Sequence, residues 1–204
     1  MIIAIEGIDG AGKTTQVRLL CDVLTKFGVP AHPVKMALFV SSGYKYYRET
    51  LQQLKSRDKP LGLGLLSSLV VLQTAHIINE EILPLHDKGE IVVCDRYLIG
   101  GLTYLRSLGA PAEAYLALAD MAPRADLTVM LRIALAVSIQ RCQERSGLLT
   151  GDRLEHLKQI FDEFKDISER VDLAIDGTLP REEITERIVA NCGAVQSVYA
   201  GLNP

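Results

Sequence analysis

The sequence predicts an α/β fold in which a five-stranded parallel sheet carries helices on both faces. The first observation behind this prediction is that short runs of valine, isoleucine and leucine alternate along the chain with longer amphipathic stretches. Nearly continuous apolar runs of this kind are typical of parallel strands that are buried on both faces. The second is the start of the chain, where a predicted strand leads through a glycine-rich loop into a predicted helix.

Five segments are predicted to form the strands. Four of them are the apolar runs at residues 2–5, 91–94, 125–131 and 171–175, and the fifth, weaker one is AHPVKM at residues 31–36. Because the four strong runs are rich in valine, isoleucine and leucine, we expect helices to cover both of their faces.

Amphipathic stretches between these strands predict the helices. Residues 13–27 form the first, which ends before Gly28, a residue suited to closing a helix. Residues 65–83 carry an apolar stripe made of Leu65, Leu69, Leu72 and His76. We expect this stripe to face the core, with the histidine as a buried structural residue rather than a ligand. Further helices are predicted at residues 153–170 and from about 181 to 198.

Length and composition predict one globular domain that spans residues 1–204. Hydrophobic residues make up 48% of the chain and charged residues 23%, which is an ordinary globular balance. The formal net charge of −3 argues against a broad nucleic-acid-binding face, which needs an excess of positive charge. We find no basic leader and no apolar run that approaches about 18 residues, so we expect a soluble cytoplasmic protein without membrane contact.

Four cysteines are widely spaced and form no CxxC pair; they are Cys21, Cys94, Cys142 and Cys192. Their spacing favours small core residues in a reducing compartment over a disulfide framework or a zinc site.

The segment GIDGAGKT, Gly7 to Thr14, matches the phosphate-binding pattern GxxxxGK[ST] between a predicted strand and a predicted helix. Its glycines let backbone N–H groups turn toward an anion, and the start of the helix adds a positive dipole end. Lys13 is placed to reach the β- and γ-phosphates of ATP, and the Thr14 hydroxyl to ligate Mg²⁺. The predicted ATP site, called the phosphate loop below, comprises Gly7, Ile8, Asp9, Gly10, Ala11, Gly12, Lys13, Thr14 and Thr15.

Asp9 is unusual in this loop, because a carboxylate opposes phosphate binding. It either faces solvent or accepts a hydrogen bond from a second substrate, and we favour the second interpretation.

Asp95 and Arg96 follow the strand that ends VVC, at the edge of the sheet where ligands bind in open α/β folds. Asp95 is a candidate for holding Mg²⁺ through water, and Arg96 for holding a second phosphate. The alternative is a structural ion pair at the strand end.

RCQERSGLLTGDRLE, residues 141–155, is a glycine-containing segment that carries several arginines. Arg141 and Arg145 fall on one helical face, and Arg153 follows the glycines. In a phosphoryl transferase, a mobile loop with an arginine can close over the γ-phosphate and stabilise charge in the transition state. The alternative is a solvated loop between two amphipathic helices.

Taken together and in order, these motifs resemble the thymidylate kinase family of nucleoside monophosphate kinases over nearly the whole chain. The resemblance implies a P-loop NTPase fold with a short lid at about residues 142–153. It also implies that ATP, with Mg²⁺, phosphorylates the 5′-phosphate of dTMP, and that the protein is a homodimer. By the same resemblance, Asp9 contacts the acceptor sugar, Arg96 holds the acceptor phosphate, and Tyr104 lies near the base.

The catalytic arginine is expected in the lid, because the phosphate loop has Gly10 where one subtype of the family has arginine. Arg145 and Arg153 are the candidates. The catalytic set implied by the resemblance is therefore Lys13, Asp95, Arg96, Arg145 and Arg153, and the metal set is Thr14 and Asp95.

The acceptor half departs from the family. MALFV at residues 36–40 stands where the family has Arg-Glu-Pro-Gly-Gly, with Arg48 kept in register as an acceptor ligand. Gln73-Thr74 replaces the base-reading arginine, and Gly100 and Leu105 replace a serine and a glutamine. Loss of a buried polar side chain that hydrogen-bonds the substrate strongly changes the discrimination between substrates.

Three functions fit these observations. The first is a dTMP kinase whose acceptor contacts include Lys35, Gln73 and either Tyr44 or Tyr46. The second is a kinase for a different, more apolar phosphate or alcohol, with Met36, Leu38 and Phe39 lining its pocket, unless MALFV merely packs as a strand end. The third is a nucleotide-binding regulatory module, against which the lack of an NKxD-like guanine reader counts.

Overall fold

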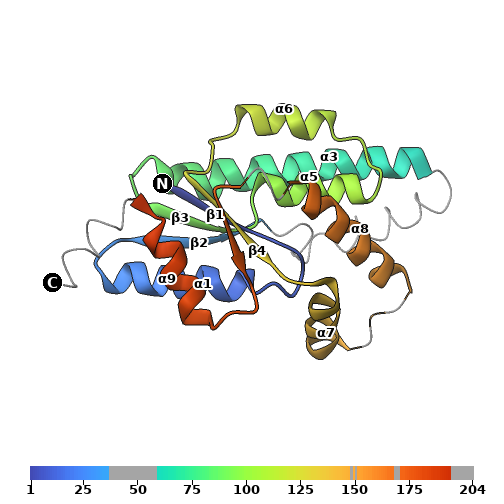
Figure 1. Cartoon of the computed structure of the whole chain (residues 1–204). Coiled ribbons are helices and arrows are strands. Elements are labelled where there is room, and N and C mark those ends of the chain that lie inside the picture. Colours follow the sequence, from blue (N-terminus) through green and yellow to red (C-terminus); the bar gives the residue numbers. More distant parts are fainter. Residues whose placement is uncertain (37–58, 148, 150, 168–170, 194–204) are drawn as a thin grey trace.

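A computed structural model describes residues 1–36, 59–147, 149, 151–167 and 171–193 (Figure 1). Its sheet contains β1 (Ile2–Glu6), β2 (Ala31–Lys35), β3 (Ile91–Asp95), β4 (Leu127–Arg132) and β5 (Leu173–Asp176). The order across the sheet is β2-β3-β1-β4-β5, and every neighbouring pair is parallel. This confirms the predicted five-stranded parallel sheet, with β4 and β5 beginning two residues later than their sequence patterns.

The helices of the described residues lie on both faces of this sheet (Figure 1). They are α1 (Lys13–Lys26), α3 (Lys59–Ile77), α4 (Leu83–His86), α5 (Leu98–Ser107), α6 (Glu113–Met121), α7 (Leu135–Ser146), α8 (Gly151–Ile167) and α9 (Arg181–Ala190), with a π-helical turn at Ile78–Ile82. Helices α1 and α9 lie on one side of the sheet, and α3 and α5 lie on the other, with α6 outside them.

Alternate residues of the central strand β1 face two different hydrophobic cores. Ile3 and Ile5 belong to a cluster with Leu20 of α1, whereas Ile2 and Ala4 belong to a cluster formed with the long helix on the opposite face. All five residues of β1 and of β3 are buried. The continuous apolar runs therefore arise because both faces of these strands are covered.

The long helix α3 shows that the predicted apolar stripe is wrong. Leu72 is 66% exposed and His76 is exposed, while Leu65 and Leu69 are only partly buried. The buried face instead carries Leu63, Leu66, Val70, Thr74 and Ile77. Because α3 is apolar nearly all round, its hydrophobic period does not single out one face. His76 is accordingly not a core histidine.

The apolar run in this region is also longer than the sequence analysis expected. Pro60–His86 is long and apolar enough to cross a membrane by length and composition, with a mean hydropathy of 1.8 over an 18-residue window. The expectation that no apolar run approaches about 18 residues was therefore wrong. The window is 44% buried inside the protein, and core helices of soluble proteins meet the same criterion, so it is weak evidence for a membrane span.

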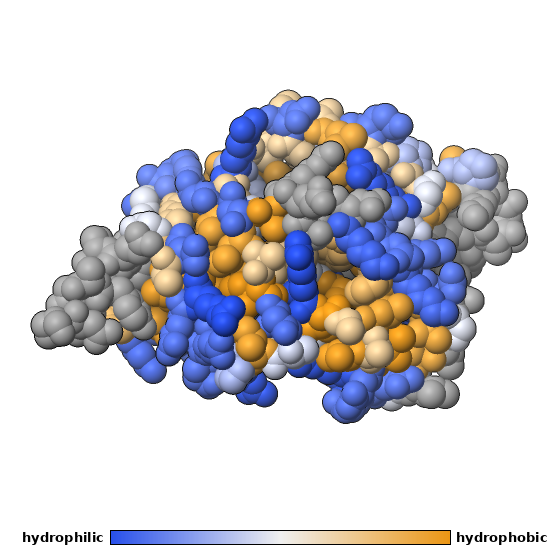
Figure 2. Space-filling view, in the orientation of Figure 1, coloured by the Kyte–Doolittle hydropathy of each residue, from blue (hydrophilic) through white to orange (hydrophobic). Residues whose placement is uncertain are grey.

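Large exposed hydrophobic side chains are found on two neighbouring helices. Leu61 and Leu72 lie on α3, and Leu116 and Met121 lie on α6. Figure 2 shows that hydrophobic residues also gather in patches between hydrophilic side chains on the face viewed in Figure 1.

The four cysteines are buried free thiols, which confirms that they are core residues.

Leu20→Ala tests the packing of α1 against the sheet. Leu20 is 0% exposed, so removing its side chain leaves a cavity in the larger core. We expect the free energy of unfolding to fall by about 2–5 kcal/mol in urea denaturation. Thr25→Ala, at an exposed position of the same helix, is the control and should change it by less than about 0.5 kcal/mol. Equal effects of the two substitutions would contradict this packing.

Candidate active site

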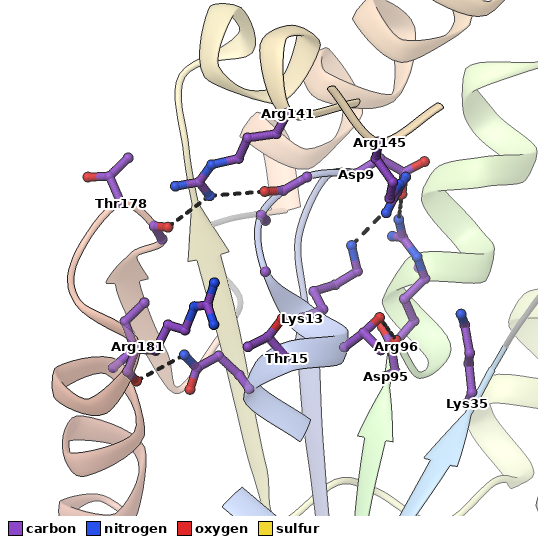
Figure 3. A pocket seen from close by; sticks show the side chains of 18 of the residues that line it. Asp9, Lys13, Thr15, Lys35, Asp95, Arg96, Arg141, Arg145, Thr178 and Arg181 are labelled. Carbon is purple, nitrogen blue, oxygen red and sulfur yellow. Dashed lines mark hydrogen bonds and ion pairs between the residues drawn. The ribbon is translucent and has the colours of Figure 1, made fainter. Parts of the chain in front are cut away.

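A cleft lies at the carboxyl edge of the sheet (Figure 3). Strand β1 pairs with β3 so that Ile5 is opposite Asp95, and the two chain segments that follow therefore leave the sheet side by side. The cleft is lined by residues 9–16, Lys35, Met36, Asp95, Arg96, Gly100, Thr103, Tyr104, Arg141, Arg145, His156, Ile160, residues 177–182 and Ile184. Most of the predicted site residues are thus brought together.

The phosphate loop adopts the backbone that its glycines predict. Gly12 has a φ of 98° where α1 begins, which a residue with a side chain rarely adopts. A side chain at Gly7 would place its Cβ 2.6 Å from the carbonyl oxygen of Leu131 in β4. The loop is therefore held close to the sheet. Gly7 and Ile8 do not line the cleft themselves, but their carbonyl oxygens accept hydrogen bonds from side chains that do.

Lys13 is buried in the centre of this loop. Its Nζ donates to the Ile8 carbonyl at 2.9 Å and lies 3.9 Å from an Asp9 carboxylate oxygen. Burial, and after it the positive charge of Arg96, lower the pKa of Lys13 to about 7, although the negative charge of Asp9 acts against them. Negative charge bound next to the Lys13 ammonium, such as that of a phosphate, would therefore stabilise the protonated form and raise this pKa.

Thr14 and Asp95 meet at the end of β3. The Thr14 hydroxyl donates to Asp95 Oδ2 at 2.5 Å, and Asp95 is 5% exposed. A hydroxyl and a carboxylate at one point fit Mg²⁺, which prefers oxygen ligands and usually takes one or two from protein and the rest from phosphate and water. Among the described residues, no group of three or more His, Cys, Asp or Glu side chains offers a fuller metal cage.

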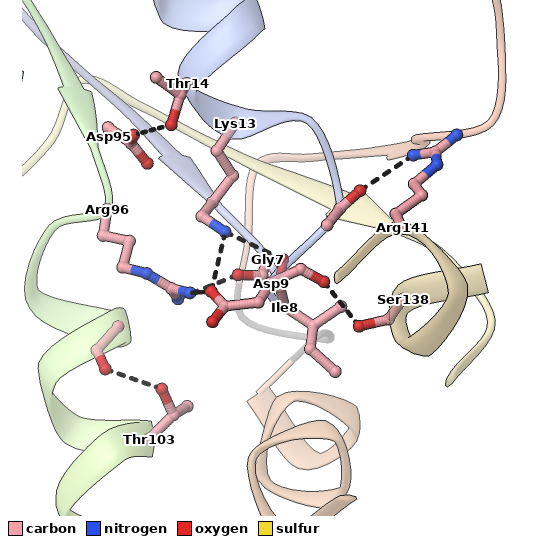
Figure 4. A network of polar contacts seen from close by, with 12 residues as sticks. Gly7, Ile8, Asp9, Lys13, Thr14, Asp95, Arg96, Thr103, Ser138 and Arg141 are labelled. Carbon is pink, nitrogen blue, oxygen red and sulfur yellow. Dashed lines mark hydrogen bonds and ion pairs between the residues drawn. The ribbon is translucent and has the colours of Figure 1, made fainter. Parts of the chain in front are cut away.

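Arg96 bridges the end of β3 to the phosphate loop (Figure 4). Its Nη1 donates to the Gly7 carbonyl at 3.0 Å, and its Nη2 donates to Asp9 Oδ1 at 2.6 Å. Burial on its own raises the pKa of Asp9, but the charges of Arg96 and Lys13 outweigh it and hold the pKa below its ordinary value. Both Asp9 and Arg96 line the cleft, so this ion pair is part of the site rather than of the sheet's outer rim.

Helix α7 supports the loop from the side opposite Arg96. The Ser138 hydroxyl donates to the Asp9 carbonyl at 2.6 Å (Figure 4). Arg141 Nη1 donates to the carbonyls of Gly10, at 3.0 Å, and Gly177, at 3.1 Å (Figure 3). Arg141 therefore ties the phosphate loop to the segment after β5. That segment, residues 177–182, lines the cleft.

The two lid candidates differ in position. Arg145, in the last turn of α7, lines the cleft and is close enough to Asp9 for its charge to lower the pKa of that carboxyl. Arg153, in α8, is exposed and does not line the cleft. Most of the segment predicted as a lid is helical, because α7 extends to Ser146 and α8 begins at Gly151.

The part of the cleft lined by α5 and α8 contains Tyr104 and a histidine that the sequence did not predict. Tyr104 of α5 and His156 of α8 pack edge to face with ring centroids 5.4 Å apart. Ser107 Oγ lies 3.1 Å from His156 Nε2. Lys35 and Met36 also line the cleft, as the sequence suggested. The histidine was missed because its place depends on contact between two helices far apart in the sequence.

Other predicted acceptor residues are not part of the described cleft. Gln73 does not line it, and Thr74 and Leu105 are buried at 2% and 0% exposure. Leu105 packs in a cluster between α3, α5 and α6. Arg48, Tyr44, Tyr46 and residues 37–40 lie outside the described residues.

Glu6 is a further residue of the site region that the sequence analysis missed. It ends β1, is 0% exposed, and its Oε1 accepts hydrogen bonds from the backbone of Tyr97 and Gly100. The signal was present, because a carboxylate closes an otherwise apolar strand directly before the phosphate loop.

Comparison with known proteins identifies the family of the chain. The sequence profile of the thymidylate kinase family matches residues 5–188. The chain is 28% identical over 189 residues to a "Probable thymidylate kinase" of Archaeoglobus fulgidus, covering 92% of each chain. It is 32% identical over 165 residues to a thymidylate kinase of Xanthomonas campestris pv. campestris, covering 79% of this chain and 70% of the relative. A thymidylate kinase of Desulfotalea psychrophila is 30% identical over 169 residues, covering 82% and 81%.

The lowered pKa of Lys13 predicts a pH-dependent affinity for Mg–ADP. Below about pH 7 the ammonium is already protonated in the empty cleft, whereas above it binding must take up a proton. We expect the affinity measured by titration calorimetry to fall roughly tenfold between about pH 7 and pH 8.5. Lys13→Arg keeps its charge throughout this range, so its affinity should not show this dependence. A wild-type affinity for Mg–ADP that is equal at both pH values would refute the lowered pKa of Lys13.

Proposed function

The chain belongs to the thymidylate kinase family, and we propose that its cleft transfers the γ-phosphoryl group of ATP to the 5′-phosphate of dTMP. The chain is thus a phosphotransferase. One observation carries the assignment of the site: Lys13, the Thr14–Asp95 pair and Arg96 converge on one cleft at the carboxyl edge of the sheet. Phosphoryl transfer needs little covalent chemistry from the protein, and positioned charges of this kind supply most of the catalysis.

The donor end of the cleft is formed by the phosphate loop and the segment after β5. Backbone N–H groups of the loop and the ammonium of Lys13 bind the β- and γ-phosphates, and residues 177–182 border the nucleotide. Thr14 and Asp95 would hold Mg²⁺. When bound there, Mg²⁺ neutralises negative charge on the phosphate oxygens.

The acceptor end is formed by Arg96, Asp9 and Tyr104. The planar guanidinium of Arg96 is suited to hold the acceptor phosphate in line with the γ-phosphate. To do so it exchanges its contact with Asp9 for the phosphate, and the freed carboxylate then faces the acceptor sugar. Tyr104 offers a ring against which a base can pack.

Arg145 is the better placed of the two lid arginines, since it lines the cleft and Arg153 does not. Its guanidinium stabilises the negative charge that spreads over the transferring group in the transition state.

The comparisons give no support to a different small-molecule acceptor or to a regulatory module. The departures from the family lie at the acceptor end, where His156 and Met36 line the cleft. We infer that these residues form different contacts to the same class of acceptor.

A coupled assay of ADP release over a panel of nucleoside monophosphates tests this function. We expect turnover with dTMP, and no ADP release above background with any monophosphate would rule the function out. Arg145→Ala should lower kcat by on the order of 10³ without a matching change in folding. Arg153→Ala is its matched control in the same region and should have a far smaller effect. The reverse order of the two variants would assign the catalytic charge to Arg153.

We also propose that the protein is a homodimer and works in the cytoplasm. The dimer, though not the location, is supported by the exposed apolar side chains on α3 and α6, Leu61, Leu72, Leu116 and Met121, which gain stability when covered by a second apolar surface.

Sedimentation velocity tests the dimer. Leu72→Glu places a charge in the proposed contact, so this variant should sediment as a monomer while the wild type sediments as a dimer. Thr25→Glu, on the opposite side of the sheet, is the control and should leave the dimer intact. A monomeric wild type would contradict the proposal, as would loss of the dimer in the control.

A further inference from the structure

Glu6 is a fully buried carboxylate beside the cleft that the mechanism above does not use. It is 0% exposed at the end of β1. Its Oε1 accepts from the backbone N–H of Tyr97 at 2.7 Å and of Gly100 at 3.3 Å. Its Oε2 is buried without a hydrogen-bond partner. Burying a carboxyl oxygen without a hydrogen-bond partner costs free energy.

The backbone that Glu6 contacts is the turn that aims Arg96. Arg96 has a φ of 70° and is, among the described residues, the one non-glycine residue with a positive φ. Such a conformation persists only where the surroundings fix it. On one side, the Arg96 N–H donates to the Ile5 carbonyl at 2.9 Å. On the other, Glu6 binds the next N–H, that of Tyr97.

The start of α5 depends on the same carboxylate. Tyr97 stands at the N-cap position of α5 and makes no side-chain cap hydrogen bond. Glu6 supplies that contact from the neighbouring strand, because it accepts from N–H groups at the start of the helix. The turn at Arg96 and the first turn of α5 are therefore fixed together from β1.

Packing and charge link Glu6 to the Arg96 side chain as well. A Cβ added at Gly100 would lie 3.0 Å from Arg96 Cβ, 3.1 Å from Arg96 Cδ and 3.1 Å from Glu6 Oε2. The stem of Arg96, the helix backbone and the carboxylate are thus in close contact. Burial raises the pKa of Glu6, and the positive charge of Arg96 acts against that rise.

We propose that Glu6 is the positioning residue for Arg96, holding the turn between β3 and α5 in the conformation that directs the guanidinium toward the acceptor phosphate. This role rests on the proposed function, since the direction of Arg96 matters only if Arg96 binds the acceptor. Glu6 does not line the cleft, so it acts through Arg96 and not on substrate.

Steady-state kinetics of Glu6→Ala and Glu6→Gln, with dTMP and ATP varied separately, test the role. We expect Glu6→Ala to lower kcat/KM for dTMP by on the order of 10²-fold, with the larger part in KM, because a small displacement of a binding group is costly. The KM for ATP should change by less than about threefold, because Lys13 is untouched. Glu6→Gln keeps an acceptor oxygen for both N–H groups, so it should lie much closer to the wild type than Glu6→Ala does.

Two further variants separate positioning from a general loss of folding. Gly100→Ala introduces a Cβ against Arg96 and Glu6 without removing the carboxylate, and it should reproduce the dTMP-specific defect even if Glu6→Ala does not fold. Ser67→Ala removes a hydrogen bond of another buried side chain, from Ser67 Oγ to the Pro111 carbonyl, away from the cleft, and should leave both KM values unchanged.

The outcomes are distinct. A dTMP-specific rise in KM in Glu6→Ala or Gly100→Ala, with recovery in Glu6→Gln, supports the role. Equal changes in the KM values for dTMP and ATP overturn it, and so does a Glu6→Gln variant no better than Glu6→Ala. If the wild type turns over dTMP and the Glu6 variants match it, only the role of Glu6 falls. If the wild type does not turn over dTMP, the proposed function falls and the role falls with it.

Discussion

The parallel pairing of β1 with β3 is the constraint on which the whole site depends. It places Ile5 opposite Asp95, so the phosphate loop and the turn at Arg96 begin at the same edge of the sheet. Arg96 then closes the gap between them through the Gly7 carbonyl and Asp9. Without this register the donor and acceptor ends would not share a cleft, and in-line transfer between them would have no geometry.

Pairing between opposite charges holds the side chains that line the cleft. Lys13 and Arg96 lie beside Asp9, and the Thr14 hydroxyl donates a hydrogen bond to one carboxylate oxygen of Asp95. Each of these contacts stands where a phosphate or a metal ion is proposed to bind. Ligands therefore exchange partners with groups that are already oriented, which limits the reorganisation needed for catalysis.

The sequence predicted the parts of this structure that depend on local or compositional signals. The central strands β1 and β3 were found because both of their faces are buried, and the phosphate loop because its chemistry is contained in consecutive residues. The edge strands β2 and β5 are only partly buried. The buried face of α3 was not found, since that helix is apolar nearly all round and Leu72 and His76 could not be told from core residues. Glu6 and His156 were missed because their roles come from contacts with residues far away in the chain, Tyr97 and Tyr104.

A crystal structure with Mg²⁺, ADP and dTMP bound is the most direct test of the central claim, that one cleft holds donor and acceptor at its two ends with Arg96 between them. The account predicts the ADP phosphates within the phosphate loop beside Lys13 and the dTMP phosphate on the Arg96 guanidinium, with the Arg96–Asp9 contact broken or shared. A dTMP phosphate bound away from Arg96, with the Arg96–Asp9 ion pair unchanged, would contradict it.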